Sequence, residues 1–449
     1  MTDCSPGPLR FARAGGKAVV ADFRGGRLTT DSGVLLLREV ERRTGLFDAL
    51  DRCIPDPRQP ELITHEQRSL LAQRVTALAL GYEDLNDHQH LRDDPALQLA
   101  AGREPAEAEA LASPATLCRL ENRVDRRALA RIAAVLVDQF IAAHREPPEA
   151  LILDFDATDD PVHGKQEGRS FHGYYDRYCY LPLYVFCGDE LLVAYLRPSN
   201  IDASRHTRAV LKLLVRRLRA AWPAVKITLR GDSGFCRWRT MRWCDHNGVG
   251  YVLGVARNPA LERLAADWTG RARRQFERTG QPQRAFGAFA YAAGSWDRPR
   301  RIIVKAEHTA QGPNPRFVVT NVPGDPRELY EEVYCQRGEA ENRIKEQQLD
   351  LFAGRTSCHR FAANQFRLLL SSAAYLLVQA LRRTALAGTE LAEAQVGTIR
   401  LKLLKVAARV AISARRVVFH LASSYPYQGL FERTCRRLAE GTARAAGSG

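Results

Sequence analysis

The stretch that most restricts how this chain can fold is LILDFDATDD, residues 151–160. Its apolar first half predicts a buried β-strand over 151–158. Because side chains alternate along a strand, Asp154 and Asp156 share one face, and purely apolar residues occupy the other. Two buried carboxylates without partners are costly, so the fold must supply cations or ligands for them.

The charge balance points to a polyanionic partner. The chain has 449 residues, typical of two or three domains, and 45% of them are hydrophobic, enough for a sizeable core. Its 66 Lys and Arg exceed its 51 Asp and Glu, which gives a net charge of +15. Such an excess indicates nucleic acid most often, although an ordinary basic enzyme remains an alternative.

Several classes of protein are excluded by missing patterns. The ten cysteines form no CxxC pair, which argues against a zinc ribbon or a secreted disulfide framework. The N-terminus has no apolar signal core, and the longest apolar run, 368–381, is too short for a bilayer. No phosphate-binding or dinucleotide-binding glycine motif is present, so we expect no nucleotide cofactor. These features predict a cytoplasmic protein without a membrane segment.

The first part, residues 1–148, is expected to be a mainly helical N-terminal DNA-binding domain. A capping box at 64–67 predicts one helix, Ser113-Pro114 opens a second, and 126–144 forms a third. The sequence Arg-Glu-Pro-Pro at 145–148 breaks the helical pattern and predicts a domain boundary.

The second part, residues 149–390, alternates strands with helices. Strands are predicted at 151–158, 180–187, 191–196, 226–231 and 251–255, and helices at 208–222 and 237–247. This order predicts an α/β domain, a mixed sheet with flanking helices.

A basic, β-rich insert interrupts this order at about 258–324. Its strands are predicted at 284–292, 301–306 and 317–321. Asp325 and Pro326 then predict the start of a long helix, with Glu328 reaching back, and a hydrophobic helix follows at 364–382. Residues 391–449 form a basic C-terminal segment, in which alternation from residue 398 favours a strand with one basic face.

Three carboxylates stand where a site could form. Asp156 and Asp232 lie at the carboxyl ends of strands, where open α/β sheets bind ligands. Glu341 lies on the long helix. Tyr334, Arg337, Glu341 and Lys345 share one arc of that helix. Taken singly, Asp232 could be a turn residue and Glu341 part of an ordinary charged face, and both alternatives stay open.

Taken together, the carboxylates predict a metal site. Hard oxygen ligands without His or Cys suit Mg²⁺ or Mn²⁺, and a cation removes the repulsion between clustered carboxylates. Two such ions, about 3.5–4 Å apart, support phosphoryl transfer. In a basic chain, the phosphate is expected to belong to a nucleic-acid backbone. Asp154, two residues deeper than Asp156, is expected to be paired with a buried arginine or to orient the site from behind.

Several motifs carry a resemblance to a known family. These are the D-x-T of Asp156-Ala157-Thr158, the strand-end Asp232, and Tyr334-x2-Arg337-x3-Glu341. They resemble the DDE transposases of bacterial insertion sequences. The segments DATDDPVHG, FHGYYDRYCYLPLY, SNIDAS, RGDSGF and ENRIKEQQLDLF resemble the insertion sequence 1380 family, over about residues 20–433.

The resemblance implies a ribonuclease H-like catalytic fold with the triad Asp156, Asp232 and Glu341. It further implies a homodimer on DNA that binds the terminal inverted repeats of its element, cleaves strands and joins them to target DNA. In a bacterium such an enzyme works in the cytoplasm, at the nucleoid. Where the wider superfamily often has a lysine six residues after the glutamate, this chain has Gln348.

Further residues are candidates for DNA contact. On the N-terminal helices these are Arg119 and Arg123, and in the insert Arg271, Arg273, Arg274 and Trp296. A solvated face for the arginines and a core position for the tryptophan remain alternatives. Two other functions also remain open: a metal-dependent nuclease of the same fold that cuts without joining, and an inactive DNA-binding regulator.

Overall fold

The computed structural model describes residues 8–105 and 110–446, and contacts within the chain divide it into two compact units. Unit 1 comprises 1–47, 56–118 and 380–449, and unit 2 comprises 48–55 and 119–379. The first and last parts of the chain therefore share a unit. Local sequence patterns pointed to an N-terminal domain and a separate C-terminal segment, because long-range pairing leaves no local signal.

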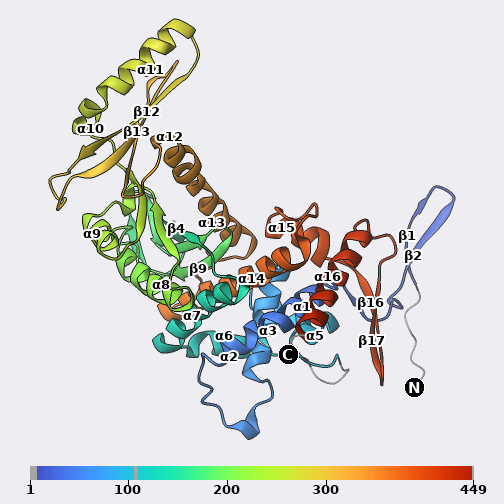
Figure 1. Ribbon diagram of the computed structural model, residues 1–449. Coiled ribbons are helices and arrows are strands. Elements are labelled where there is room, and N and C mark those ends of the chain that lie inside the picture. Colours follow the sequence, from blue (N-terminus) through green and yellow to red (C-terminus); the bar gives the residue numbers. More distant parts are fainter. Residues whose placement is uncertain (1–7, 106–109, 447–449) are drawn as a thin grey trace, which may run out of the picture. The chain divides into compact units, whose positions relative to one another are not determined.

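A mixed sheet forms the centre of unit 2 (Figure 1). Its first five strands are β4 (Ala150–Ala157), β8 (Leu183–Cys187), β9 (Glu190–Tyr195), β10 (Lys226–Gly231) and β11 (Gly250–Val255). They lie in the order β9-β8-β4-β10-β11, with β8 antiparallel to its neighbours and the other four parallel to one another. This confirms the predicted mixed α/β class, and the strand order fits a ribonuclease H-like core.

Helices complete this core. They are α6 (Pro114–Arg123), α7 (Arg126–Ala143), α8 (Thr207–Ala221), α9 (Trp238–His246) and α14 (Phe361–Leu381). The apolar face of β4 is fully buried, and the ring of Phe155 lies 6.4 Å from that of Phe235. The alternation seen in the sequence therefore gives β4 one core face and one face that carries the aspartates.

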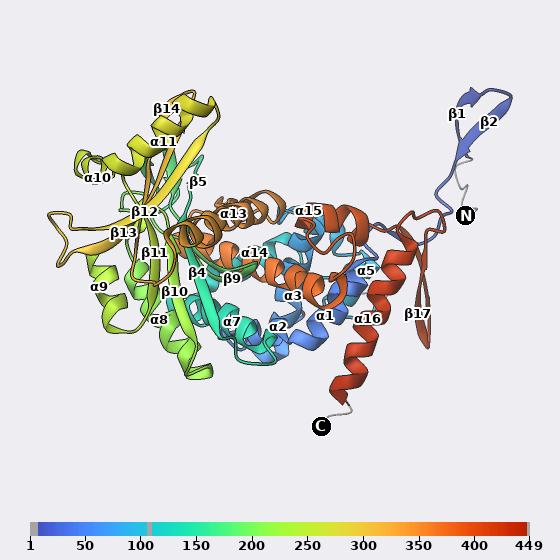
Figure 2. The same ribbon diagram turned by 45° about the horizontal axis from the view of Figure 1, so that its top comes forward.

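The insert extends the same sheet. Its elements are α10 (Pro259–Leu264), α11 (Ala266–Thr279), β12 (Gln283–Tyr291), β13 (Arg300–Thr309), β14 (Gly312–Pro313) and β15 (Arg316–Thr320). Because β15 pairs antiparallel with β11, the insert strands continue the core sheet in the order β11-β15-β13-β12. Figure 2 shows α10 and α11 beside these strands. The three main strands are confirmed, but the sequence analysis did not predict the two helices.

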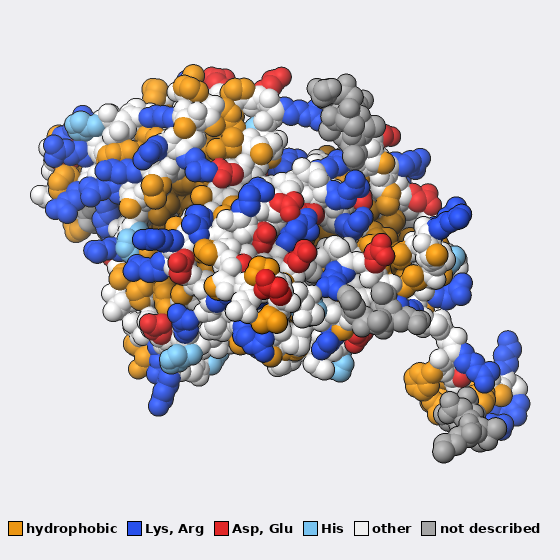
Figure 3. Space-filling view, turned by 90° about the horizontal axis from the view of Figure 1, so that it is seen from below, with side chains coloured by type: hydrophobic (Ala, Val, Ile, Leu, Met, Phe, Trp, Pro, Cys, Tyr) orange, Lys and Arg blue, Asp and Glu red, His pale blue; other side chains and the backbone are white. Residues whose placement is uncertain are grey.

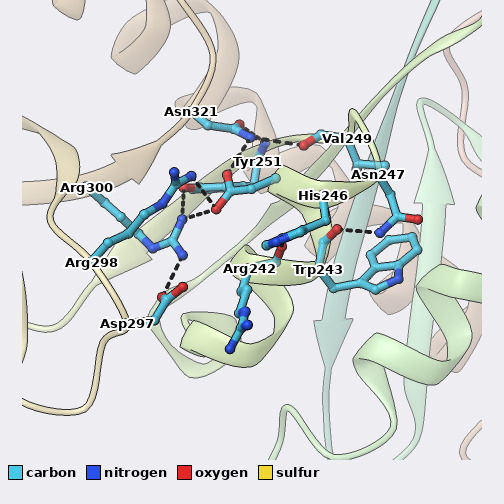
Figure 4. A network of polar contacts seen from close by, with 11 residues as sticks. Arg242, Trp243, His246, Asn247, Val249, Tyr251, Asp297, Arg298, Arg300 and Asn321 are labelled. Atoms are coloured by element: carbon cyan, nitrogen blue, oxygen red, sulfur yellow. Dashed lines mark hydrogen bonds and ion pairs between the residues drawn. The ribbon is translucent and has the colours of Figure 1, made fainter.

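A buried polar network ties the insert to the core (Figure 4). The guanidinium of Arg300 is almost fully buried and donates to the hydroxyl of Tyr251 at 2.7 Å and to Asp297 at 2.9 Å. It also pairs with Asp245 on α9, whose other oxygen accepts from Asn321 at 3.2 Å. Since these residues come from α9, β11, β13 and the end of β15, the network joins all four elements.

Two other predictions for unit 2 need correction. Residues 180–187 do not form one strand, because Pro182 breaks the ladder. The chain instead makes β7 (Arg177–Tyr180), which pairs with β5 (Asp160–Pro161) and β6 (Ser170–His172), and then β8 in the main sheet. The long helix begins at Asp325 as predicted, since this side chain accepts from the amides of residues 327 and 328. The reach of Glu328 back to the N-cap is not seen among the described contacts.

Unit 1 is helical with small sheets. Its helices are α1 (Val34–Thr44), α3 (Gln67–Leu80), α4 (His88–Leu91), α5 (Pro95–Ala100), α15 (Val396–Ile399) and α16 (Gln428–Ala446), and α2 (Leu46–Asp51) starts in this unit. Its strands are β1 (Leu9–Ala14), β2 (Lys17–Ala21), β3 (Leu28–Thr29), β16 (Ala408–Ser413) and β17 (Arg416–Leu421). Because β3 pairs with β16, the two ends of the chain meet in one sheet.

Two predictions in unit 1 were wrong. The tail from residue 398 is helical up to residue 404, and Leu401 is exposed although Ile399 and Leu403 are buried. The residues alternate between apolar and basic, but they form a helical turn, in which this alternation does not define two faces. The capping box at 64–67 is also absent, because α3 begins at Gln67 without a side-chain cap.

One helical stretch, Phe361–Leu386, is long and apolar enough by composition to cross a membrane. Its apolar window is 83% buried inside the protein, as in the core helix of a soluble protein. The nine cysteines that the structure describes form no disulfide with one another.

Candidate active site

Asp156 lies at the carboxyl end of β4, on the face away from the core. Its Oδ1 accepts from the following amide, of Ala157, at 2.8 Å, which fixes the carboxylate at the strand end. The side chain is 15% exposed, so it is accessible to a ligand without being fully solvated.

Asp154 lies two residues deeper and has a fixed partner. β10 runs parallel to β4 with Arg230 directly opposite Asp154. The Arg230 guanidinium binds both carboxylate oxygens, at 2.6 Å for the Nη2–Oδ2 pair, and also donates to the carbonyl of Val333. This confirms the expected buried arginine partner. The pair links β4, β10 and the segment that leads to Glu341.

Asp232 follows β10 at the same edge of the sheet. Its Oδ1 accepts from the amide of Gly234 at 2.8 Å and caps a short 3₁₀ turn, Ser233–Phe235. The turn role foreseen as an alternative is therefore present, but it occupies only one oxygen in the described contacts. Gly254 of β11 lies behind: a Cβ there would be 2.6 Å from the Tyr334 hydroxyl and 2.9 Å from the amide of Ser233. Only glycine permits this close approach.

Glu341 comes from a helical segment of changing pitch. The segment passes from a short α-turn through a π-helix at Leu329–Tyr334 and a 3₁₀ turn at Cys335–Arg337 into α13 (Gly338–Asp350). Wide π-turns of this kind occur frequently at functional sites. The change of pitch turns Arg337 and Glu341 toward the strand ends.

Arg337 connects two of the three carboxylates. Its Nη2 lies 2.7 Å from Oε1 of Glu341, and its Nη1 lies 3.7 Å from Oδ2 of Asp156. Tyr334 lies near the third, since its hydroxyl and the backbone of Asp232 both lie next to Gly254 of β11. Burial raises the pKa of the Tyr334 phenol, Arg337 opposes the rise, and the charge of Asp232 adds to it. The structure thus places Arg337 between Asp156 and Glu341, and Tyr334 beside Asp232.

The electrostatics of the site follow from this crowding. Burial raises the pKa of Asp156 to about 6; the Ala157 amide and Arg337 oppose the rise, and the charges of Asp232 and Glu341 add to it. A raised pKa means that the ionised form of Asp156 is destabilised next to other carboxylates, and a bound cation would stabilise that form. At present the guanidinium of Arg337 supplies that positive charge.

The three carboxylates are the kind of ligand that a divalent metal prefers, but their present positions would not hold one. Within residues 8–105 and 110–446, no three Asp, Glu, His or Cys side chains lie close enough to hold an ion as they stand. Arg337 stands between Asp156 and Glu341, so its guanidinium would have to move for these carboxylates to share a metal.

Lys345, which was expected to support the site, and Gln348, which stands where the wider superfamily often has a lysine, behave differently from Arg337. Lys345 is exposed, with no contact to Glu341 among the described residues. Gln348 points inward: its amide donates to Oδ1 of Asp160 at 2.8 Å and to the carbonyl of Asp159 at 3.2 Å. It therefore ties the end of α13 to the loop after Asp156.

Asp160 is a buried carboxyl that the sequence analysis did not single out. It is fully buried, and burial raises its pKa to about 7, against the opposing effect of the Gln348 hydrogen bond. Among the described residues, the hydroxyl of Tyr184, also fully buried, has no hydrogen-bond partner. The four-aspartate run hid this residue, because nothing in the pattern distinguishes a buried aspartate from a solvated one. Arg230 could have been found, since its alternation with Asp232 places it on the aspartate face.

The candidate DNA-contact residues are spread over both ends of unit 2. Arg119 on α6 is exposed and Arg123 half-buried. Arg271, Arg273 and Arg274 are exposed on α11, where Arg273 pairs with Glu277 at 2.7 Å. Trp296 is half-buried, packs against the core and lies edge-on to Tyr291 at 5.5 Å. None of these residues lies among the contacts of the carboxylate site.

Comparison with known proteins adds a family. The family described as Transposase DDE domain group 1 matches residues 11–443. Among solved structures, the chain is similar to a piggyBac transposase synaptic complex with hairpin DNA, at 9% identity and a TM-score of 0.42. That match covers 84% of this chain and 80% of the other, and we draw no conclusion from it. Comparison with curated proteins gave no match.

Proposed function

The chain belongs to the family described as Transposase DDE domain group 1, and from this premise we propose that it moves a DNA element by cutting and joining strands. It binds the terminal inverted repeats of an insertion sequence, cleaves there, and joins the freed 3′ ends to target DNA. We assign it, more narrowly, to the insertion sequence 1380 family. Because two ends must be held together, the active form is a homodimer on DNA.

One observation carries this proposal. Asp156, Asp232 and Glu341 come from two strand ends and a helix 109 residues further on, yet Arg337 lies between Asp156 and Glu341, and the charges of Asp232 and Glu341 both act on Asp156. A structural salt-bridge network would need no third carboxylate. The charge of the whole chain, +15, supports a nucleic-acid substrate.

Mg²⁺ or Mn²⁺, in two sites, would be held by Asp156, Asp232 and Glu341 and would supply Lewis acidity for phosphoryl transfer. The Gly234 amide holds one oxygen of Asp232, and the second, which has no partner among the described contacts, would be the one to bind a metal. Arg337, once released from the carboxylates, can pair with a DNA phosphate through the same two nitrogens. Asp154 and Arg230 hold the strand ends in register from below.

The DNA contacts outside the site are assigned to Arg119 and Arg123 on α6, and to Arg271, Arg273, Arg274 and Trp296 of the insert. The exposed arginines are suited to phosphate contacts. Trp296 is half-buried and packs against the core, so a packing role for it is better supported than stacking on a base.

The experiment uses labelled DNA that carries the element's own ends, identified by sequencing the flanks of the gene. Wild-type protein with Mg²⁺ should cut these ends and join pre-cut ends to a plasmid. Glu341→Gln should bind the ends equally well but neither cut nor join, since it removes one metal-ligand charge at constant size. Cutting without joining would identify a nuclease, and binding without either reaction by wild type would identify an inactive regulator.

A further inference from the structure

Helix α8 carries a regular row of basic residues on its exposed side. Arg208, Lys212 and Arg216 are spaced four residues apart and all three are exposed. Successive members lie about 6 Å apart, so the row is about 12 Å long. The apolar side of α8, which the row borders, is buried in the core through Leu211, Leu214, Val215 and Leu218. We call these three residues the α8 row.

Among the described residues, the α8 row lacks carboxylate partners, unlike Arg217 on the same helix. In the described part of the chain, none of its members forms an ion pair, and Lys212 contacts only the ring of Trp243, at 5.8 Å. By contrast, Arg217 on the same helix pairs with Asp138. Arg219 donates to the carbonyls of Asn247 and Gly248 at 2.7 and 2.9 Å.

The sheet topology places the start of the row at the active-site edge. β9 runs parallel to β4, so it ends at the same edge of the sheet as the strand that carries Asp156. α8 begins after a loop at that edge and runs back along the sheet. Arg208, in its first turn, is therefore the member nearest the carboxylate site.

Helix α9 widens the same basic surface. The connections β9-α8-β10 and β10-α9-β11 cross the sheet in one direction, so with right-handed crossovers both helices cover one face. The contact between Lys212 and Trp243 of α9 agrees with this. α9 begins six residues after Asp232 and carries the exposed Arg239 and Arg242. Figure 3 shows Lys and Arg side chains crowded toward the side on which Figure 1 draws α8 and α9.

We propose that the α8 row binds the phosphate backbone of duplex DNA that leads away from the active site. Aligned positive charges without counter-charges repel one another, and a polyanion of regular spacing removes that repulsion. Backbone contacts carry no sequence information, so the row holds DNA of any sequence. This proposal rests on the proposed function, because it requires that the carboxylate site acts on DNA.

The test compares two triple variants that lose the same charge. One replaces the row, Arg208→Gln/Lys212→Gln/Arg216→Gln. The control replaces three partnered basic residues of the same unit, Arg217→Gln/Arg219→Gln/Lys226→Gln; Lys226 pairs with Glu149 at 3.0 Å. Circular dichroism and thermal unfolding establish that each variant is folded. Binding to a mixed-sequence duplex and to a duplex with the element's ends is measured by fluorescence anisotropy from 50 to 200 mM salt.

The row variant should lower the slope of log affinity against log salt by about 2.7, since each phosphate contact contributes about 0.9. Its loss of affinity between 50 and 200 mM should therefore be about 40-fold smaller than that of wild type. The control should keep the wild-type slope. If the row triple does not fold, Lys212→Gln alone should lower the slope by about 0.9.

The outcomes separate this proposal from the function on which it rests. A wild-type protein that binds neither duplex contradicts the proposed function itself. If wild type binds and the row variant keeps its slope, the row is a solvated face and the proposal is wrong. An equal fall in slope for the control would assign the effect to overall charge. A fall on the end-bearing duplex alone would overturn the claim that the row holds any sequence.

Discussion

Strand β4 carries two aspartates that each pair with an arginine, and the two pairs differ in kind. At the deeper position, Asp154 and Arg230 are both almost fully buried, and the guanidinium binds both carboxylate oxygens. At the carboxyl end, Asp156 meets Arg337 at 3.7 Å, and that arginine binds Glu341 more closely, at 2.7 Å. The arginine side chain is 21% exposed there, against 7% for Arg230.

The difference shows how one strand can serve both the fold and a site. A bidentate pair with a further carbonyl contact leaves Arg230 little freedom, so the deep pair fixes the register of β4, β10 and the segment before α13. A longer, shared contact at the surface can be exchanged for another cation. We therefore infer that the Asp154–Arg230 pair stabilises the fold, whereas Arg337 can be replaced at Asp156 by another cation.

The largest expected effect separates the two aspartates. Asp156→Asn should reduce Mg²⁺-dependent cleavage by at least about 10³-fold while the protein stays folded, because it removes a metal-ligand charge worth several kcal/mol. Asp154→Asn should retain measurable cleavage but lower the free energy of unfolding, by up to about 3–5 kcal/mol, since it leaves Arg230 buried without its counter-charge. Cleavage of labelled ends and urea unfolding measure the two effects. A folded but inactive Asp154 variant beside an active Asp156 variant would reverse the comparison.

The next effect concerns Arg337, whose guanidinium stands where a metal ion would bind. Arg337→Gln should raise the affinity of the DNA-free protein for Mn²⁺ by about tenfold, since it removes a positive charge next to two ligands. Arg230→Gln serves as the contrasting variant and should lower stability without raising metal affinity. Isothermal titration with Mn²⁺ gives both values. Unchanged affinity in the Arg337 variant would mean that its guanidinium does not compete with the metal.

An effect of about the same size, on cleavage instead of metal affinity, is expected from the contact that ties α13 to the loop after Asp156. Gln348→Ala should slow cleavage by about tenfold through kcat, because a shift of Glu341 against Asp156 misplaces the reacting groups. Asp160→Asn keeps an oxygen that accepts from Gln348 and is the matched control, with cleavage close to wild type. Equal losses in both variants would point to the charge of Asp160 and not to the contact.

The Asp160 variant should instead change the dependence of stability on pH. The pKa of Asp160 is about 7 in the fold, against 3.8 when exposed, so the folded state binds more protons between these values. Its contribution to the free energy of unfolding is therefore complete below about pH 4 and is lost as the pH rises to about 7. Asp160→Asn, which cannot titrate, should flatten this fall. Urea unfolding at pH 4.5, 6 and 7.5 measures it; an unaltered profile would contradict the buried carboxyl as its source.

The sequence predicted where the two aspartates of β4 lie, but not which arginine contacts each of them. Alternation in LILDFDA was enough to place Asp154 and Asp156 on one face, because a strand has a fixed period. Which arginine each would meet depended on strand order and on a π-turn before Arg337, and neither has a local signature. For the same reason the alternation from residue 398 favoured a strand: Leu401 is apolar, but only packing shows that it faces solvent.

The most direct test that Asp156 and Asp232 bind a metal replaces each carboxylate by a thiolate. Asp156→Cys and Asp232→Cys should each abolish cleavage of the element's ends in Mg²⁺, a hard cation that binds thiolate poorly. Cleavage should return in part when Mn²⁺ replaces Mg²⁺, whereas Asp154→Cys should show no such dependence on the metal. If Asp156→Cys cleaves in Mg²⁺ as well as wild type does, Asp156 is not a metal ligand and the account of β4 is wrong.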